Sequence, residues 1–427
     1  MKLNNNIFLL LSFLTISTLF LGNKKQGPFL SYLSLFILNL IFFVSGLMDI
    51  NIFWGPDYVN LSESSRLTLC CLSGFNFFAM FFYFKKINYL LVKNILTYMI
   101  IYLGSFYLLT TNSLFSYALL FQFISMMMFF PFMDSYKNEE VKNILNIYIL
   151  KIFVFCLMIL GLGFFVGSTN GVSIASFEVV NESLYVLCVC FFILILFFTL
   201  GCFPFHTTVS ILNENINENN LFSYFIIEKN ILTWSLVLVL QLLLPKLNGY
   251  YGDIIIDSVK VFAIITTFYG VLVACHQTNL KSIISFFSIG NTGFILLYAV
   301  TPTLPEMNEQ FFLFLLFYSV IMTLNIQLIN LNKNQIKDLK DLTFLFQRRP
   351  KFATALFASL FLFFSSIIPS GLILNFKFFM TAYSEKLYFE LILIIATNLC
   401  GGAFLISKVL VIFKRFIKVK KKLILAK

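Results

Sequence analysis

Residues 365–380 read SSIIPSGLILNFKFFM, and Lys377 is the single charged side chain in this apolar run. Residues 222–240 read FSYFIIEKNILTWSLVLVL, where Lys229 stands beside Glu228 in similar surroundings. A bilayer offers backbone groups no water to bond with, so runs of this kind cross it as helices. A lysine at the centre of such a helix costs about 2.5–3.5 kcal/mol and is a functional residue by default. The two stretches therefore predict a helical membrane protein that moves ions or protons.

The composition of the whole chain supports an all-α integral membrane fold. The 427 residues are 59% hydrophobic and 11% charged, whereas soluble domains carry about 25% charged residues. The apolar runs do not alternate with polar residues, which excludes a membrane β-barrel. The net charge of +11 lies mainly in loops and in the C-terminal tail, so it indicates membrane orientation and not a nucleic-acid partner.

Apolar runs long enough to cross the hydrocarbon core, which takes about 20 residues, predict a bundle of about thirteen transmembrane helices. We treat residues 1–427 as a single transmembrane domain. The predicted spans lie near 6–22, 28–48, 66–84, 92–111, 113–133, 144–167, 182–203, 221–245, 256–276, 281–300, 310–331, 352–380 and 387–413.

Residue usage and loop charge predict where the protein resides. The chain holds 57 Phe and 19 Tyr, with abundant Ile, Asn and Lys, which is the usage that AT-rich codons produce. This bias favours a mitochondrially encoded protein of the inner membrane. Lysine and arginine gather after the first, third and eleventh predicted helices and in the C-terminal tail. By the positive-inside rule these segments face the matrix. The eight cysteines lack metal-ligand spacing with histidine, and no metal site is expected.

Two predicted helices contain residues that break a helix. The seventh ends in FFTLGCFPFHTTV, with Gly201 and Pro204, and the twelfth contains Pro369 and Gly371. Proline removes a backbone donor and clashes with the preceding turn. Transporters place such broken helices at ion sites, where unwound backbone lines a hydrated cavity. A kink accommodated by packing is the alternative, but a second break eight residues before Lys377 favours a functional role.

Three segments resemble one family. They read LGCFPFH (200–206), HQTNLKSIISFFSIGNTGF (276–294) and PSGLILNFKFF (369–379). In this order they resemble the antiporter-like proton-pumping subunits of respiratory complex I, and most of all the subunit 2 branch. The resemblance implies two inverted five-helix repeats, each with a broken helix, and a hydrated line of ionisable side chains along the membrane midplane. Residues 1–112 would form the N-terminal helices, 113–245 the first repeat, and 246–427 the second repeat with the C-terminal helix.

The resemblance also implies a place in an enzyme. The chain would be a subunit of the proton-translocating NADH:ubiquinone reductase and would couple quinone reduction to proton transfer. It would carry no NADH, flavin or iron–sulfur cofactor itself. Its expected partners are protons, the other membrane-arm subunits, and inner-membrane lipids such as cardiolipin.

Several family positions keep their charge in this chain and others do not. Lys377 falls on the family's distal lysine and Lys229 on the central lysine of the eighth helix. In contrast, the family's fifth-helix glutamate, seventh-helix lysine and tenth-helix histidine fall on neutral residues: Gln122, Thr199 and Asn291.

The sixth helix poses a separate question, because the family lysine there aligns with Asn146. Lys151 stands five residues later, on a different helix face. We include Lys151 in the predicted proton path, and Glu228 as a candidate substitute acid.

The neutral residues leave three hypotheses open. Losing glutamate and lysine together avoids an uncompensated buried charge, which costs about 3–5 kcal/mol. Glutamine and threonine hold water but do not titrate near neutral pH, so the first half of the path is expected to be impaired or rerouted. The chain is then a proton-translocating subunit, a structural subunit with a degenerate and non-pumping path, or a stand-alone cation/proton antiporter. The structural alternative for Lys229 and Lys377 is that each long side chain lies near a helix end and extends to the lipid headgroups.

Overall fold

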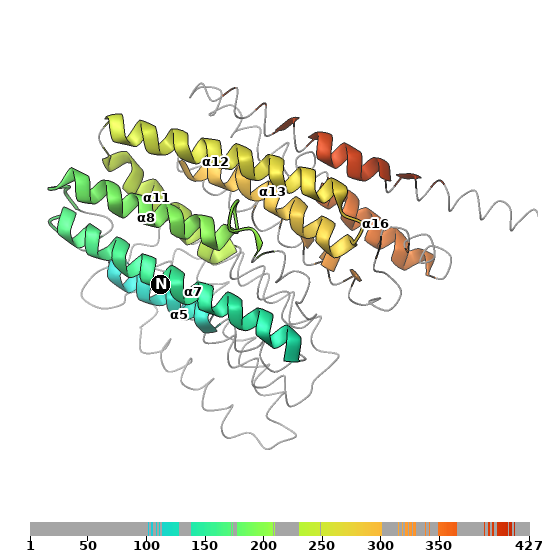
Figure 1. The fold of residues 1–427 in the computed structure, drawn as a ribbon, viewed down its shortest axis with the longest axis horizontal. Coiled ribbons are helices and arrows are strands. Elements are labelled where there is room, and N and C mark those ends of the chain that lie inside the picture. The colour runs from blue at the N-terminus through green and yellow to red at the C-terminus, as the bar shows by residue number, and fades with distance from the viewer. Residues whose placement is uncertain are drawn as a thin grey trace, which may run out of the picture. The chain divides into compact units, whose positions relative to one another are not determined.

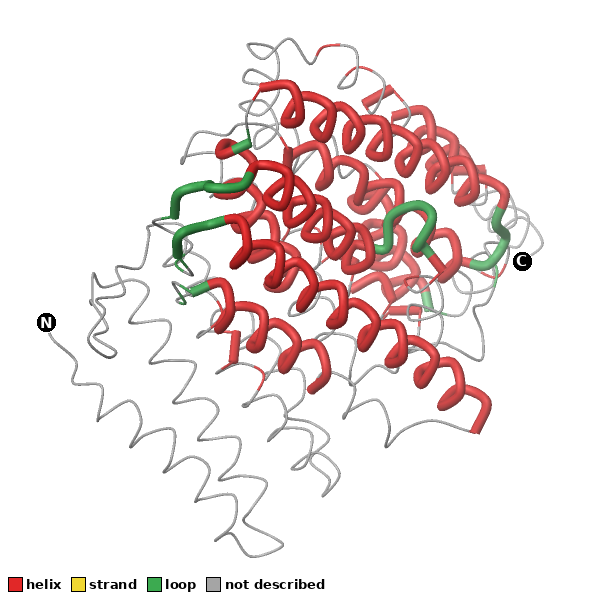
Figure 2. The backbone as a smooth tube through the Cα atoms, turned by 60° about the vertical axis from the view of Figure 1, so that its left-hand side comes forward, coloured by secondary structure: helices red, strands yellow, loops and turns green. Residues whose placement is uncertain are grey.

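The structure is a computed structural model. It describes residues 113–127, 138–171, 177–207, 230–247, 249–300, 349–364 and 399–408, together with isolated positions between 101 and 414 (Figure 1). The described elements are helical, with short loops between them (Figure 2). The chain divides into two compact units, one made of 1–191 with 222–235 and the other of 192–221 with 236–427.

In the first unit, helix α5 (Leu114–Met127) packs beside α7 (Asn138–Ser168), as Figures 1 and 2 both show. Helix α8 (Glu182–Leu200) begins in this unit and ends in the second one. The link from α7 to α8 is held by the Phe177 ring, whose centroid lies 5.1 Å from Phe165 on α7 and 5.9 Å from Tyr185 on α8. These contacts bury the apolar end of the link.

The second unit is built around α13. It contains most of α11 (Thr233–Leu243), the 3₁₀ turn Leu244–Lys246, α12 (Gly249–His276), α13 (Leu280–Val300) and α16 (Pro350–Phe364). Only residues 277–279 separate α12 from α13, so the two helices form an antiparallel pair (Figures 1 and 2). They approach so closely that a Cβ atom on Gly270 would lie 2.2 Å from the Gly290 backbone nitrogen.

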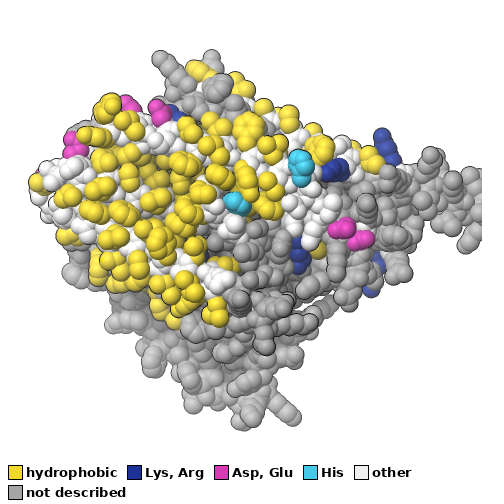
Figure 3. All heavy atoms as spheres, viewed as in Figure 1, with side chains coloured by type: hydrophobic (Ala, Val, Ile, Leu, Met, Phe, Trp, Pro, Cys, Tyr) yellow, Lys and Arg dark blue, Asp and Glu magenta, His cyan; other side chains and the backbone are white. Residues whose placement is uncertain are grey.

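Four helices among the described residues are long and apolar enough to cross a membrane. They coincide closely with four predicted spans and run over Leu145–Ser168, Glu182–Leu200, Gly249–His276 and Leu280–Val300. The described face in Figure 3 is covered mainly by apolar side chains, as a lipid or subunit neighbour would require. The remaining predicted spans lie partly or wholly outside the described residues, and the count of thirteen stays a prediction.

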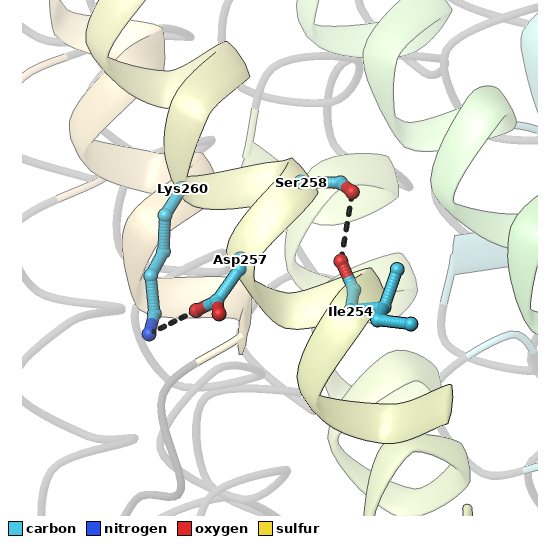
Figure 4. A network of polar contacts seen from close by, with 4 residues as sticks. All are labelled: Ile254, Asp257, Ser258 and Lys260. Atoms are coloured by element: carbon cyan, nitrogen blue, oxygen red, sulfur yellow. Dashed lines mark hydrogen bonds and ion pairs between the residues drawn. The ribbon is translucent and has the colours of Figure 1, made fainter. Parts of the chain in front are cut away.

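The start of α12 differs from the predicted one. The helix begins at Gly249, whereas the apolar run predicted residue 256. Twenty-eight helical residues extend about 42 Å, which exceeds a hydrocarbon core of about 30 Å. The first turns therefore tolerate polar groups. There the Lys260 Nζ atom lies 2.8 Å from Asp257 Oδ1, and Ser258 Oγ donates to the Ile254 carbonyl at 2.7 Å (Figure 4).

Candidate functional site

The structure places Gln122 on α5 against Lys151 on α7. Gln122 Nε2 donates to the Lys151 carbonyl oxygen at 3.4 Å, and Ser125 Oγ donates to Gln122 Oε1 at 3.2 Å. Lys151 is 7% exposed and shares the buried side of α7 with Val154 and Met158. A buried ammonium thus lies on a helix whose opposite face is apolar and exposed. The contact between the two helices here is made by the Gln122 side chain and the Lys151 backbone.

A second buried residue of α5, Tyr117, contacts the stretch that follows Lys229. Tyr117 Oη donates to Ser235 Oγ at 3.1 Å, and Ser235 Oγ donates to the Leu232 carbonyl at 2.9 Å. Residues 230–232 adopt a π-helical conformation, which widens the helix and recurs at functional sites. The Thr233 hydroxyl beside them is buried and makes no hydrogen bond. Buried polar groups therefore continue along the first unit from α5 into residues 230–235.

In the second unit, α8 ends at Leu200 with a two-bond closure at Gly201. The Cys202 N–H donates to the Phe197 carbonyl at 3.0 Å and the Gly201 N–H to the Phe198 carbonyl at 3.2 Å. This pattern is a Schellman motif, whose C′ residue takes a left-handed conformation. Gly201 fits it with φ of 65°. The helix therefore stops at its glycine, and residues 201–206, including Pro204, are not helical.

Thr199 and Asn291, which we predicted to fall on the family's lysine and histidine positions, are both buried polar residues. The Thr199 side chain is buried, and its hydroxyl donates back to the Leu196 carbonyl at 3.0 Å. Asn291 is buried on α13, near the Tyr318 hydroxyl and Ser288. Its Nδ2 atom makes no hydrogen bond. Both positions are thus polar, neutral and shielded from solvent.

Sequence reasoning missed one contact, which joins His206, in the non-helical segment after α8, to α12. The Tyr269 Oη atom lies 2.7 Å from His206 Nε2. The two residues are 63 positions apart, so no spacing rule connects them. The one feature of the sequence that could have drawn attention to His206 is its place two residues after Pro204, at the end of a broken helix. Lys229, Glu228, Lys377, Pro369 and Gly371 lie outside the described residues.

The described residues hold no group of three or more His, Cys, Asp or Glu side chains that could bind a metal ion.

At the C-terminal end of α12, the Lys408 Nζ atom donates to the Cys275 carbonyl at 2.6 Å. Nearby in sequence, Asn279 forms an isolated antiparallel bridge with Asp338. These contacts bring three segments to the α12–α13 junction: residues 277–279, the stretch around 338, and the end of helix 399–408.

Sequence comparison identifies relatives among bacterial respiratory proteins. The chain is 24% identical over 418 residues to "NADH-quinone oxidoreductase subunit N 2" of Hydrogenobaculum sp., covering 94% of this chain and 86% of that protein. It is 24% identical over 198 residues to subunit N of Rickettsia typhi, covering 44% of this chain and 42% of that one. No protein-family model matches the sequence.

Solved structures share the fold. Respiratory complex I from Thermus thermophilus contains a chain that matches with a TM-score of 0.71 at 15% identity, over 95% of this chain and 88% of that chain. A chain of the Mrp complex from Dietzia sp. matches with a TM-score of 0.75 at 15% identity, over 94% of this chain and 77% of that chain. An archaeal membrane-bound sulfane sulfur reductase gives 0.76 at 14% identity, with 94% and 85% covered.

The motifs, the relatives and the fold agree. The chain is similar in sequence to subunit N of NADH-quinone oxidoreductase, and it shares its fold with chains of respiratory complex I and of the Mrp complex.

Proposed function

We propose that the chain is a proton-translocating membrane-arm subunit of mitochondrial NADH:ubiquinone oxidoreductase, of the subunit 2 type. The relatives named as subunit N support the complex, and the AT-rich residue usage supports the mitochondrion. The observation that carries the proton function is the burial of Lys151, which is 7% exposed in a 31-residue apolar helix and whose backbone carbonyl accepts a hydrogen bond from Gln122. Intramembrane lysines of this kind mark ion and proton paths.

The proposed path runs from Lys151 through Lys229 to Lys377. Gln122 at the entrance holds water and passes hydrogen bonds but does not ionise, so Lys151 is the first residue of the path that takes up a proton. No redox chemistry occurs on this chain. Energy from quinone reduction would arrive from the other subunits as a change in electrostatics or conformation, and neutralising or moving one charge of the line would shift the next.

Substitution of Lys151 in the assembled complex tests the proposal. Lys151→Met removes the charge, whereas Lys151→Arg keeps the charge but does not release a proton in proteins. Both variants should lower the number of protons pumped per NADH oxidised, with complex I assembled at its normal level. Lys260→Met is the matched control, because Lys260 is half-buried on α12 and pairs with the exposed Asp257. Normal pumping in both Lys151 variants contradicts the proposal.

A structural subunit is the second candidate, and Thr199 and Gln122 favour it. Neither side chain titrates, and the Thr199 hydroxyl is directed back to its own helix. The double substitution Thr199→Lys with Gln122→Glu restores the family charges. Pumping should rise in the double variant if the native path is dead, and it should be unchanged or fall if the native path already works.

A free-standing cation/proton antiporter is the third candidate, and the likeness to a chain of the Mrp complex keeps it open. Gentle solubilisation separates the cases. The proposed subunit migrates together with NADH-oxidising activity, and an antiporter migrates without it.

A further inference from the structure

Helix 399–408, drawn in red in Figure 1, lies on α12 and ends beside the last turn of α12. Gly401 faces Val271 so closely that a Cβ atom at Gly401 would overlap the Val271 side chain. Seven residues later, the Lys408 Nζ atom donates to the Cys275 carbonyl oxygen at 2.6 Å. These two contacts fix the Lys408 ammonium at the C-terminal end of α12, where the helix dipole also favours a positive charge.

The Lys408 ammonium can make more hydrogen bonds than this one. It carries three N–H groups, of which one bonds the Cys275 carbonyl, and the Phe404 ring centroid lies 4.5 Å from the nitrogen. Among the described residues, no carboxylate forms an ion pair with Lys408. Two acidic residues, Asp338 and Asp341, lie at the same junction, and Asp341 Oδ2 accepts the Asp338 backbone N–H at 2.9 Å. The described part of the chain thus holds a half-buried cation in place without supplying its counter-ion.

Lys408 lies where an apolar helix gives way to a polar loop. The apolar span of α12 ends at His276, and three polar residues, 277–279, follow it. On the hydrocarbon side, Leu272 of α12 is 57% exposed and Phe404 is 45% exposed. A phospholipid presents the matching order, with apolar chains in the hydrocarbon core and a charged phosphate at its boundary.

The sequence after Lys408 adds positive charge. Lys414 is exposed, and Arg415, Lys418 and three lysines at 420–422 follow it. A cluster of about four to eight basic residues beside a transmembrane helix attracts anionic lipids. That attraction alone would be diffuse, whereas Lys408 is held against α12 at one place. Charge and packing together therefore favour an anionic phospholipid over a zwitterionic one.

We propose that Lys408, where helix 399–408 meets the end of α12, binds the phosphate of an anionic phospholipid whose acyl chains lie along Leu272 and Phe404. The ammonium donates to a phosphate oxygen in a charge-assisted hydrogen bond and keeps its bond to the Cys275 carbonyl. The lipid supplies the missing counter-ion and stabilises the packing of helix 399–408 on α12. The site is independent of the proposed proton function, because it requires only that the chain lies in a membrane.

Binding is measured on the full-length chain in mild detergent, titrated with phosphatidylglycerol and followed by native mass spectrometry. Lys408→Gln should weaken binding of the first phosphatidylglycerol about fivefold, as expected for one basic residue at an anionic surface. Lys408→Arg keeps the charge and should bind like the native chain. Phosphatidylcholine should bind weakly and equally to all variants. Native-like phosphatidylglycerol binding by Lys408→Gln overturns the site.

Lys246→Gln is the matched control, since Lys246 is exposed in the turn before the opposite end of α12. It should bind phosphatidylglycerol like the native chain. A loss equal to that of Lys408→Gln overturns the proposal, because the attraction would then be general surface charge and not a site.

Inorganic phosphate is the other source of the same chemistry. A large excess of it should leave phosphatidylglycerol bound, and displacement of the lipid by phosphate overturns the lipid assignment. The native chain offers a test that needs no variant to fold. Phosphatidylglycerol with a photoreactive acyl chain should label the peptides that contain Leu272 and Phe404, and labelling confined to other helices overturns the proposal.

Discussion

At the residue scale, helix phase decides which side chains form the site. Asn146 is the aligned position on the sixth predicted helix, yet it is exposed, whereas Lys151 is buried. Five residues turn a helix by about 500°, so the two positions point about 140° apart. The sequence could not choose between them, because α7 is apolar on both sides and gives no sign of its inner face. The contact of His206 with Tyr269 was equally hidden, because it depends on tertiary packing.

Two buried asparagines of the second unit, Asn325 and Asn291, should contribute differently to the free energy of unfolding. Asn325 Nδ2 donates to the Ser359 carbonyl at 3.1 Å, and Ser359 Oγ donates to Asn325 Oδ1 at 2.9 Å. Asn291 Nδ2 makes no hydrogen bond. Asn325→Ala leaves buried groups of Ser359 unsatisfied and should cost about 1–3 kcal/mol more than Asn291→Ala. Thermal unfolding of both variants in one lipid mixture measures the difference, and equal losses would show that Asn291 has partners of similar strength.

At the element scale, the sequence predicted where helices exist better than where they begin. Four predicted spans match described helices, because a continuous apolar run has few alternatives in a bilayer. The start of α12 was predicted too late, since Asp253 interrupts the apolar run although it lies within the helix. Hydropathy reports the part of a helix inside the hydrocarbon, whereas helices continue into the headgroup region. Helix α8 ends at Leu200, three residues before the predicted end of the span at 203, because Gly201 takes the left-handed conformation that closes the helix.

Two glycine substitutions, one in the α12–α13 pair and one on α7, should have opposite effects on stability. At Gly270 a Cβ atom would lie 2.6 Å from the Gly290 Cα atom, so Gly270→Ala forces the helices apart. Overpacking of this kind costs about 1–3 kcal/mol. Gly163 on α7 has nothing within 4 Å of its Cβ position, and Gly163→Ala should be neutral or stabilise by about 0.5–1 kcal/mol through helix propensity. Thermal unfolding in nanodiscs tests both, and a stable Gly270→Ala protein would mean that the pair is packed more loosely.

At the scale of the whole molecule, contacts at the α12–α13 junction bring together segments that the loop charges predict to lie on one side of the membrane. Lys408 bonds the last turn of α12, which also favours a positive charge at that helix end, and Asn279 pairs with Asp338. Two of the three segments that meet there follow the ninth and eleventh predicted helices, and Lys408 lies near the end of the thirteenth. Odd-numbered loops on one side are what the positive-inside rule requires. Loop charge predicted this grouping, but the contacts that hold it together could not be predicted, since they join positions far apart in sequence.

The orientation has a direct test with single cysteines in a cysteine-free full-length chain. Thr278→Cys lies at the junction and Tyr250→Cys lies at the opposite end of α12, and both positions are exposed. About 42 Å of helix separates the two ends, so they should open on opposite sides of the membrane. In vesicles that expose the matrix side, a membrane-impermeant maleimide should label Thr278→Cys and a cysteine at Lys427 but not Tyr250→Cys. In vesicles of the opposite orientation the pattern should reverse. Labelling of Thr278→Cys and Lys427→Cys from different sides contradicts the shared junction, because Lys408 cannot then reach the end of α12.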